Sequence, residues 1–449
     1  MAAHQVWQGE FPYLDFFYVQ MPLLPYLYSF ISHSGFDSLF EGRAISMLLT
    51  LFMGLLLFSF SKKMTGDTKI PLFLFFLFSF NGLILTWNSV VKTYAFSNLF
   101  AFLSFIFYSR VFLCAKIRSV DFFLSGIFIG LALNCRSVFF LIFLAQAVMI
   151  LLLFKSRLFS LARFLAGAIS SSLLSLYLFL KNPDSFVFNN FTYHQLWGKE
   201  IIQMGLLGKI YTFAKFLFYP QNLLIMILAT LTILFLATKK GDKKSILEKD
   251  RVYLTAFVFS VIILVGYFLA TPTQLQYYHQ ALPYLLVLSI PGLSRLKDFS
   301  AKRKFILCGI CAFYLLCLIP YLLIFIFTIR EKDKDFRIDQ VRKVVEVVKE
   351  NSTEKEMILT DWPGYAVLAK RIVVQGTETC GQDVSHLLTE EQWKRFKIID
   401  KGKMKDIIEN KKVRLIVMGF GTYRYLNDLI RENYYLLKKT GGAEVFMKR

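Results

Sequence analysis

A series of long apolar segments runs along the first 328 residues, and this pattern restricts the fold more than any motif does. About eight segments approach the length of a membrane span, roughly 20 residues. Two shorter apolar segments, 122–134 and 137–154, flank Asn134-Cys135-Arg136. The eight longer segments cover approximately residues 43–61, 71–89, 93–109, 164–181, 222–238, 252–270, 281–294 and 304–328. We therefore expect an α-helical polytopic membrane protein with about ten transmembrane helices.

The charge of the chain has to be interpreted in this membrane setting. The net charge is +21, which in a soluble protein would suggest a nucleic-acid partner. Only 18% of the residues are charged, however, and 56% are hydrophobic. Most basic residues lie between apolar segments, where they set the orientation of the spans. We therefore exclude nucleic acid as a partner.

The basic residues also predict which loops face the cytoplasm. When alternate loops are assigned to opposite faces, one face receives about twenty Lys and Arg residues and the other about seven. The richer face is expected to be cytoplasmic. The N-terminal loop, the loops at 182–221 and 271–280, and everything after about residue 329 then lie outside. We expect a multi-pass protein of the plasma (inner) membrane.

The last part of the chain has a different character. Residues 329–449 mix both charges and contain no apolar run long enough to cross a membrane. A stripe of valines from Val341 to Val348 predicts a helix, and residues 357–360 and 413–418 read as buried strands. We expect two domains: a transmembrane domain at 1–328 with an outer first loop at 1–42, and a small soluble extracytoplasmic α/β domain at 329–449.

Two acids in the first loop are the leading candidates for chemistry. Glu10 and Asp15 lie among aromatic residues and prolines that favour the membrane interface and fix the path of the loop. A carboxylate there can take a proton from a hydroxyl group or bind a metal ion. The alternative is that Asp15 only caps or solvates the loop.

Four segments resemble a known family of membrane enzymes. Residues 3–29, which contain Gly9-Glu10-Phe11-Pro12-Tyr13 and Asp15, resemble the first extracytoplasmic loop of the GT-C superfamily of polytopic glycosyltransferases. That superfamily includes the dolichyl-phosphate-mannose protein mannosyltransferases and the bacterial RgtA/B/C/D-like group. Three later segments are similar to other elements of these proteins: Glu41–Ser46, Leu124–Arg136 and Gln276–Pro283.

The resemblance implies a function and a set of site residues. Such enzymes move a sugar from a polyprenyl-phosphate donor to a glycan, lipid or protein acceptor at the outer membrane face, with inversion. Glu10 and Asp15 would then be catalytic, and cations would stabilise the departing lipid phosphate. The expected residues for phosphate or donor binding are Arg136, Lys199, His194, His279 and Tyr278. No cofactor is expected with certainty, and the sequence leaves a divalent metal open.

Each donor-binding candidate also has a purely structural interpretation. A charge between two short spans is costly unless it is paired or wet, so Arg136 is the sharpest candidate; it could instead extend to the lipid headgroups. Lys199 could simply face water. His194, His279 and Tyr278 are of residue types common at membrane interfaces without function.

The chain departs from the family in its first residues. The resemblance implies a leading acid soon after a first transmembrane helix, ahead of the Gly9–Tyr13 element. We favour the interpretation that this helix and acid lie upstream of Met1 and that the chain is N-terminally truncated. The alternative is that the first loop crosses the membrane unaided, in which case Asp15 acts alone or the protein is inactive. A lysine that some relatives carry before the loop proline is Met21 here.

Two other classes of function remain open. A transporter or flippase for lipid-linked glycans would usually show two related halves with polar residues inside the spans, and neither is apparent. A non-catalytic membrane scaffold, whose outer domain binds a partner, is the third possibility.

Overall fold

The computed structural model describes residues 1–33, 38–113, 118–238, 247–296, 309–320, 322–323, 338–378, 384, 387–419 and 424–449. The chain forms two compact units, each assembled from separate segments. The helical unit comprises Arg43–Leu173 and Met204–Leu322. The mixed unit comprises Met1–Gly42, Leu174–Gln203 and Leu323–Arg449. The predicted domain boundary near residue 328 lies outside the described residues and stays a prediction.

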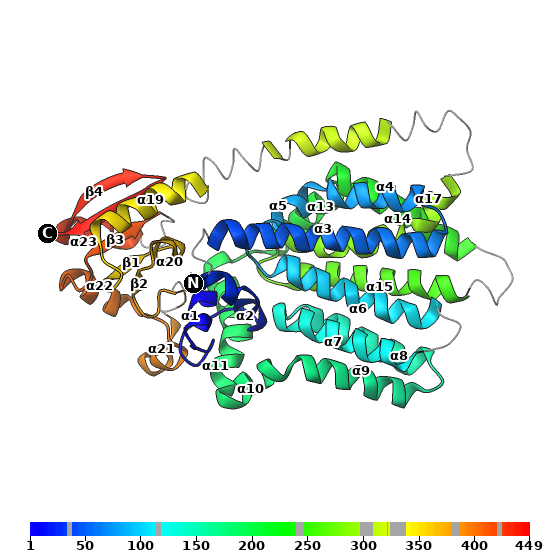
Figure 1. Cartoon of the computed structure of the whole chain (residues 1–449), viewed down its shortest axis with the longest axis horizontal. Helices are drawn as coiled ribbons and strands as arrows, with labels where there is room; N and C mark the ends of the chain where they lie inside the picture. The colour runs from blue at the N-terminus through cyan, green and yellow to red at the C-terminus, as the bar shows by residue number, and fades with distance from the viewer. Residues whose placement is uncertain are drawn as a thin grey trace. The chain divides into compact units, whose positions relative to one another are not determined.

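Apolar helices that run side by side make up the helical unit (Figure 1). Those in its first segment are α3 (Ser38–Thr65, which begins in the mixed unit), α4 (Lys69–Ser79), α5 (Gly82–Asn88), α6 (Tyr94–Leu113), α7 (Ser119–Cys135), α8 (Phe139–Leu153) and α9 (Arg157–Ser171). Those in its second segment are α13 (Leu206–Leu217), α14 (Pro220–Thr238), α15 (Leu247–Leu269), the 3₁₀ helix η4 (Leu275–Ala281), α16 (Leu282–Leu288), α17 (Ile290–Leu296) and a helix at Gly309–Pro320.

The apolar segments predicted from sequence are helical where they are described, but several are short or broken. Among the described residues, three helices, within α3, α6 and α15, are long and apolar enough to cross a membrane, and the count rises to six if each of three bent helix pairs is one span. The bent pairs are α4 with α5, α9 with α10 (Leu173–Lys181), and α13 with α14. Shorter apolar helices are α7, α8 and Gly309–Pro320. The expected number of about ten spans therefore stays a prediction.

Two of the helix breaks share one set of polar side chains. The chain bends by 58° between α4 and α5 and by 79° between α13 and α14. Asn81 caps α5 by accepting the N–H groups of Leu83 (3.1 Å) and Ile84 (3.3 Å). Gln221 accepts the N–H of Gly82 at 2.8 Å and donates to the carbonyl of Phe80 at 2.9 Å. The backbone groups freed by the α4–α5 break are thus satisfied within the protein, as an apolar environment requires.

Helices α7 and α9 approach closely because glycines line their contact. A Cβ atom at Gly126 would lie 2.0 Å from the carbonyl oxygen of Phe164, and one at Gly167 would lie 2.1 Å from that of Phe123. Both clashes involve backbone atoms, which cannot rotate away. Small residues of this kind allow close backbone packing between membrane helices.

The mixed unit combines the N-terminal segment, the middle segment and the C-terminal segment. The N-terminal segment holds α1 (Ala2–Trp7), α2 (Leu23–Ser29) and η1 (Phe30–His33). The middle segment holds most of α10, then α11 (Pro183–Val187), η2 (Phe188–Thr192), α12 (Tyr193–Leu196) and η3 (Trp197–Ile202). The C-terminal segment holds α19 (Ile338–Asn351), β1 (Met357–Thr360), α20 (Gly364–Ala369), β2 (Ile372–Val373), α21 (Glu390–Phe396), α22 (Lys401–Glu409), β3 (Leu415–Met418), η7 (Arg424–Leu426), α23 (Asn427–Asn433), β4 (Tyr434–Thr440) and β5 (Ala443–Lys448).

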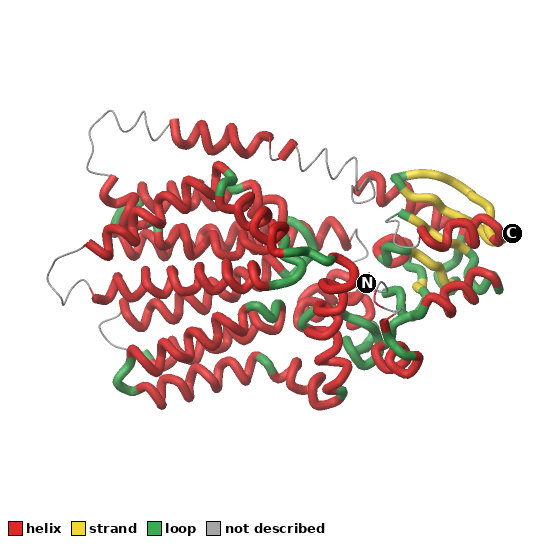
Figure 2. Tube along the Cα trace, turned by 180° about the vertical axis from the view of Figure 1, so that it is seen from behind, coloured by secondary structure: helices red, strands yellow, loops and turns green. Residues whose placement is uncertain are grey.

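The C-terminal segment forms a five-stranded sheet in the order β2-β1-β3-β5-β4 (Figure 2). Strands β2, β1 and β3 are parallel, and β5 runs antiparallel to β3 and β4. Alternate side chains pack on opposite faces: Ile358 and Leu415 belong to the core with α19 and α20, whereas Leu359 and Ile416 belong to the core with α22 and α23. The predicted helix and both predicted strands are confirmed, and the small α/β fold with them.

A buried carboxyl group follows β2. The side chain of Glu378 is only 4% exposed, and its Oε2 accepts the N–H of Gly376 at 2.8 Å. Burial, and to a smaller extent the charge of Glu10 in the first loop, raises the pKa of Glu378 to about 7. The folded chain therefore holds a proton on Glu378 more tightly than the unfolded chain does.

The glycine contact predicts a large effect from one added methyl group. We expect Gly167→Ala to lower the free energy of unfolding by about 1–3 kcal/mol, because α7 and α9 must move apart. The measurement is the melting temperature of the purified chain in detergent. The matched control is Gly309→Ala, where a Cβ atom would meet nothing within 4 Å. Equal melting temperatures for the two variants would contradict the close contact.

Glu378 predicts a pH-dependent stability. Its raised pKa stabilises the fold fully below the ordinary pKa of 4.5, and this contribution of up to about 3 kcal/mol is lost as the pH rises through about 7. Glu378→Gln keeps an oxygen for the N–H of Gly376 and removes the ionisation. We expect the variant to melt higher than the parent at pH 8 and near it at pH 5. Identical pH profiles would show that Glu378 is not buried as described.

Candidate functional site

Buried aromatic side chains fix the conformation of the first loop, which carries Asp15. Tyr13 has a left-handed backbone with φ of 68°, and its N–H donates to the carbonyl of Phe16 at 3.0 Å. The side chains of Tyr13, Phe16 and Tyr18 are buried in one cluster with Leu178 of α10. The loop conformation is therefore fixed by packing within the mixed unit.

Asp15 is exposed at this loop and also helps to hold it. Its Oδ2 accepts the N–H of Phe11 at 2.7 Å, and its own N–H donates to the carbonyl of Phe11 at 3.0 Å. This contact is the loop cap that the sequence offers as the structural alternative. The cap also orients the carboxylate. Its second oxygen makes no hydrogen bond to a described residue.

Glu10 lies in the electrostatic field of two other acids of the mixed unit. Burial and then the charge of Asp15 raise the pKa of Glu10, and Glu10 in turn raises that of Glu378. Like charges repel here, so the three carboxyl groups are not independent. Within the described residues, no three His, Cys, Asp or Glu side chains gather so that they could hold a metal ion.

Arg136 follows the last residue of α7 and lies among three tyrosine rings of the helical unit. Its guanidinium carbon lies 4.6 Å from the ring centre of Tyr94, 5.0 Å from that of Tyr277 and 5.4 Å from that of Tyr267. One guanidinium nitrogen donates to the hydroxyl of Thr93 at 3.2 Å. We call these five residues the arginine cage.

The arginine cage holds a positive charge without a carboxylate. In the described residues, no Asp or Glu side chain lies within 4 Å of the guanidinium. Aromatic faces attract a guanidinium, but they do not neutralise its charge. Arg136 as a whole residue is partly exposed. A guanidinium without an acid partner among the described residues is a candidate for binding phosphate or carboxylate.

His279 and Tyr278 support this region from inside the helical unit. His279 Nε2 lies 2.9 Å from Asn88 Oδ1 and 3.2 Å from Asn98 Nδ2, and the ring packs edge-on against Tyr94 at 5.1 Å. Burial, and then the charge of Arg136, lowers the pKa of His279 to about 3, so its ring is neutral. Tyr278 is buried, and its hydroxyl bonds to that of Thr273 at 2.8 Å.

His194 and Lys199 belong to the mixed unit. His194 Nε2 lies 2.8 Å from the carbonyl of Val19. This contact joins α12 to the part of the first loop that follows Asp15. Lys199 is exposed on η3. The structure thus brings Glu10, Asp15 and His194 into one unit with Lys199, and it brings Arg136 and His279 into the other with Tyr278.

The sequence interpretation missed most members of the arginine cage. Tyr277 lies within the segment at 276–283 that resembles the family, yet its neighbour Tyr278 was the expected contact. Tyr94 and Tyr267 lie at the ends of apolar segments, where tyrosine is common for reasons of membrane position alone. Two polar residues lie inside predicted apolar segments: Asn88 in 71–89 and Asn98 in 93–109. They are the signal that could have marked this end of the helices.

Comparisons with known proteins show the fold. No protein-family model matches the chain, and no curated protein matches it in sequence. Among solved structures, it is similar to ArnT from Cupriavidus metallidurans in the apo state, with a TM-score of 0.65 and 10% identity over 99% of this chain and 91% of that chain. The same coverage and identity, with a TM-score of 0.64, are found for that ArnT bound to undecaprenyl phosphate.

A third similar structure is the Archaeoglobus fulgidus oligosaccharyltransferase tethered with an acceptor peptide. Its TM-score is 0.50 at 12% identity, over 97% of this chain and 67% of that chain. All three identities are too low to indicate more than architecture. The chain shares its fold with these structures, in agreement with the fold that the resemblance in the sequence implies.

Proposed function

We propose that this chain is an integral membrane glycosyltransferase that moves a sugar from a polyprenyl-phosphate donor to an acceptor at the outer membrane face. The observation that carries the proposal is the arginine cage, a guanidinium open to anions in a fold shared with ArnT. One ArnT structure is bound to undecaprenyl phosphate. A lipid phosphate is an anion that such a cation would bind.

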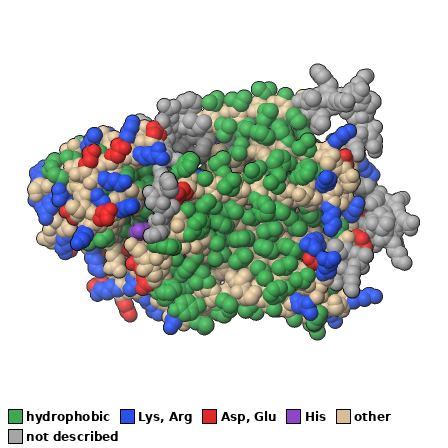
Figure 3. Space-filling model, viewed as in Figure 1, with side chains coloured by type: hydrophobic (Ala, Val, Ile, Leu, Met, Phe, Trp, Pro, Cys, Tyr) green, Lys and Arg blue, Asp and Glu red, His purple; other side chains and the backbone are tan. Residues whose placement is uncertain are grey.

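The position of the cage supports the outer face. Basic residues gather at one end of the helices of the helical unit (Figure 3). They include Lys62 and Lys63 at the end of α3 and Arg110 near the end of α6. The cage lies at the opposite helix ends, because Tyr94 begins α6 and Arg136 follows α7. By the positive-inside rule, the cage then faces outward. The proposal includes an extracytoplasmic C-terminal α/β part at a plasma membrane, which the distribution of basic residues among the loops predicts.

The proposed reaction uses the acids and the cage for different steps. An acceptor hydroxyl oxygen attacks the anomeric carbon of the donor sugar, and the bond between that carbon and the phosphate oxygen breaks. Attack from the opposite side inverts the anomeric configuration. The electron pair goes to the lipid phosphate, whose added charge Arg136 stabilises. The hydroxyl proton goes to a carboxylate, for which Asp15 is the exposed and oriented candidate.

The other candidate residues have supporting roles in this proposal. Glu10, whose pKa is raised by burial and by the charge of Asp15, lies in the same loop as the proposed base. Neutral His279 packs against Tyr94 and helps to fix one wall of the cage. Tyr278, also on η4, is buried and holds this helix in the core of the helical unit. His194 and Lys199 lie in the mixed unit, where Lys199 offers a second cation to an anionic substrate.

Arg136→Gln tests the cage. We expect transfer from a radiolabelled polyprenyl-phosphate sugar, measured in detergent, to fall by about 10² or more in kcat, because the departing phosphate loses its cation. Arg136→Lys keeps the charge but loses the flat guanidinium, so it should recover activity only in part. The matched control is Arg163→Gln, which also removes a guanidinium from an aromatic ring, 4.3 Å from Phe159. Wild-type turnover by Arg136→Gln would remove Arg136 from the reaction.

Asp15→Asn distinguishes the two roles of Asp15, as a base in the reaction and as a cap of the loop. Asparagine can still accept the N–H of Phe11, so the loop should keep its conformation while transfer falls by about 10² or more. Asp67→Asn is the matched control, because Asp67 also accepts backbone N–H groups at a helix start. Transport cannot be scored in detergent, so sugar transfer there also distinguishes an enzyme from a flippase. Full activity of Asp15→Asn would assign the cap alone to Asp15.

A further inference from the structure

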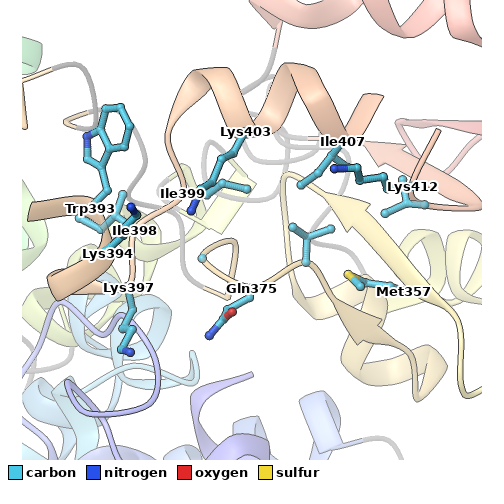
Figure 4. A pocket seen from close by; sticks show the side chains of 13 residues that line it. Met357, Gln375, Trp393, Lys394, Lys397, Ile398, Ile399, Lys403, Ile407 and Lys412 are labelled. Atoms are coloured by element: carbon cyan, nitrogen blue, oxygen red, sulfur yellow. The ribbon is translucent and has the colours of Figure 1, made fainter. Parts of the chain in front are cut away.

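A pocket of about 430 Å³ opens in the C-terminal part of the mixed unit (Figure 4). Its volume lies within the range of small-molecule sites. Met357 of β1 and Gln375 after β2 line one side, and α21, α22 and the segment before β3 line the rest. None of the expected site residues contributes to it.

The lining carries positive charge and no acid. Four lysines line the pocket, and among the lining residues there is no Asp, Glu or His. Two of the lysines are paired: Lys394 with Glu390 at 2.9 Å and Lys412 with Asp406 at 2.5 Å. The other two, Lys397 and Lys403, form no ion pair with a described carboxylate. The excess charge selects an anion.

Local backbone structure places these two lysines. Lys397 ends α21 in the left-handed region, with φ of 59°. Asp400 begins α22, and its carboxylate accepts the N–H groups of Gly402 (2.5 Å) and Lys403 (3.1 Å). The nearest acid in sequence is therefore engaged as a helix cap. Gly376 lies so close to Ile399 that a Cβ atom would meet its nitrogen at 2.7 Å, so the loop after β2 closes one wall of the pocket.

The remaining lining is apolar and fits more than a bare anion. Side chains of Val374, Ile398, Ile399, Ile407 and Val413 form the walls, with Trp393 at one side and the amide of Gln375 at another. Figure 4 shows Lys403 on α22 and Gln375 on the far side of the same hollow. Apolar walls accept the C–H faces of a sugar ring, and an amide with ammonium groups binds its hydroxyl and acidic substituents.

We propose that this pocket binds an anionic saccharide, a sugar ring that carries a phosphate or carboxylate group, and holds it as part of the acceptor. The assignment as acceptor rests on the proposed function, whereas the binding does not. The ligand can be a free saccharide or the headgroup of a glycolipid, which share this chemistry.

Binding is tested on the purified full chain in phosphatidylcholine nanodiscs by calorimetry. Glucose 1-phosphate and glucuronic acid should bind at least about tenfold more tightly than glucose, and added salt should weaken them. Inorganic phosphate alone should bind more weakly than glucose 1-phosphate, because it leaves the apolar walls empty. Equal affinity for glucose and glucose 1-phosphate would overturn the proposal.

Matched variants locate the binding. Lys397→Asn combined with Lys403→Gln should lower the affinity for glucose 1-phosphate by about tenfold or more. The control is Lys370→Asn combined with Lys405→Gln: Lys370 also ends a helix with a left-handed backbone, and Lys405 lies on α22 outside the pocket. Asparagine tolerates the left-handed backbone, so both pairs should fold and melt alike. Equal loss of affinity in both pairs would overturn the pocket as the site.

Two further arms distinguish the source and the role of the ligand. If the natural ligand is lipid-linked, glucuronosyl diacylglycerol added to the nanodiscs should compete with glucuronic acid for binding. If the natural ligand is a soluble saccharide, we expect no such competition. In the transfer assay, the Lys397 and Lys403 variant should raise the KM for an anionic acceptor and leave the KM for the donor unchanged. An unchanged acceptor KM would overturn the acceptor role. Absence of transfer in the parent chain would refute the proposed function and leave the binding result intact.

Discussion

The guanidinium of Arg136 has no acid beside it in the part of the chain that the structure describes, and the aromatic rings at the surrounding helix ends stabilise its charge. A cation away from bulk water is costly unless it is paired, solvated or faced by π electrons. Here the rings come from the start of α6, the end of α15 and η4, and the hydroxyl of Thr93 accepts a hydrogen bond from the guanidinium. The start of α6 must therefore meet α15 and η4, which follow it by more than 150 residues. In the proposed function, the charge that the rings stabilise is the one that binds the lipid phosphate.

The breaks in the apolar helices are part of this arrangement. The bend before α5 requires the cap made by Asn81 and the contacts of Gln221, because freed backbone groups find no water in an apolar environment. The short helix α5 then ends at Asn88, which lies against His279. His279 in turn packs against Tyr94, the closest ring to Arg136. A continuous helix through residues 69–88 would lose the cap at Asn81, from which this chain of contacts starts.

Sequence periodicity predicted the elements whose burial is regular, and it missed those that depend on a single junction. The valine stripe of α19 and the strands β1 and β3 follow directly from their spacing. Hydropathy averages over a bend, so the apolar segment 71–89 gave no sign of the break between α4 and α5. The hairpin of β4 and β5 was missed although Gly441 and Gly442, both with positive φ, are a strong turn signal.

For the site, the sequence found the charged groups but not their surroundings. Asp15 and Arg136 were identified because acids and cations are rare beside apolar segments. Their partners could not be read from the sequence, because tyrosines at helix ends serve membrane position as often as they serve a cation. Glu378 was missed for a related reason: its burial depends on the loop after β2, and no local pattern reports that.

Charge is separated within the mixed unit in a way that fits two different tasks. Glu10 interacts unfavourably with Asp15 and with Glu378, so this group of acids disfavours an anion. The pocket that four lysines line attracts an anion. Helix α21 connects the pocket to the middle segment, because Phe396 stacks on Phe188 at 3.8 Å and Arg395 pairs with Asp184.

The pocket is therefore anchored to the segment that also holds His194 and, through it, the chain after the first loop. An anionic acceptor is drawn by its charge to the lysines and repelled by the acids. Only an uncharged part of that acceptor, such as a hydroxyl group, can then approach Asp15 without electrostatic cost. A base that must take a proton from a neutral hydroxyl gains selectivity from this separation, since the acidic groups of the acceptor are kept away from it.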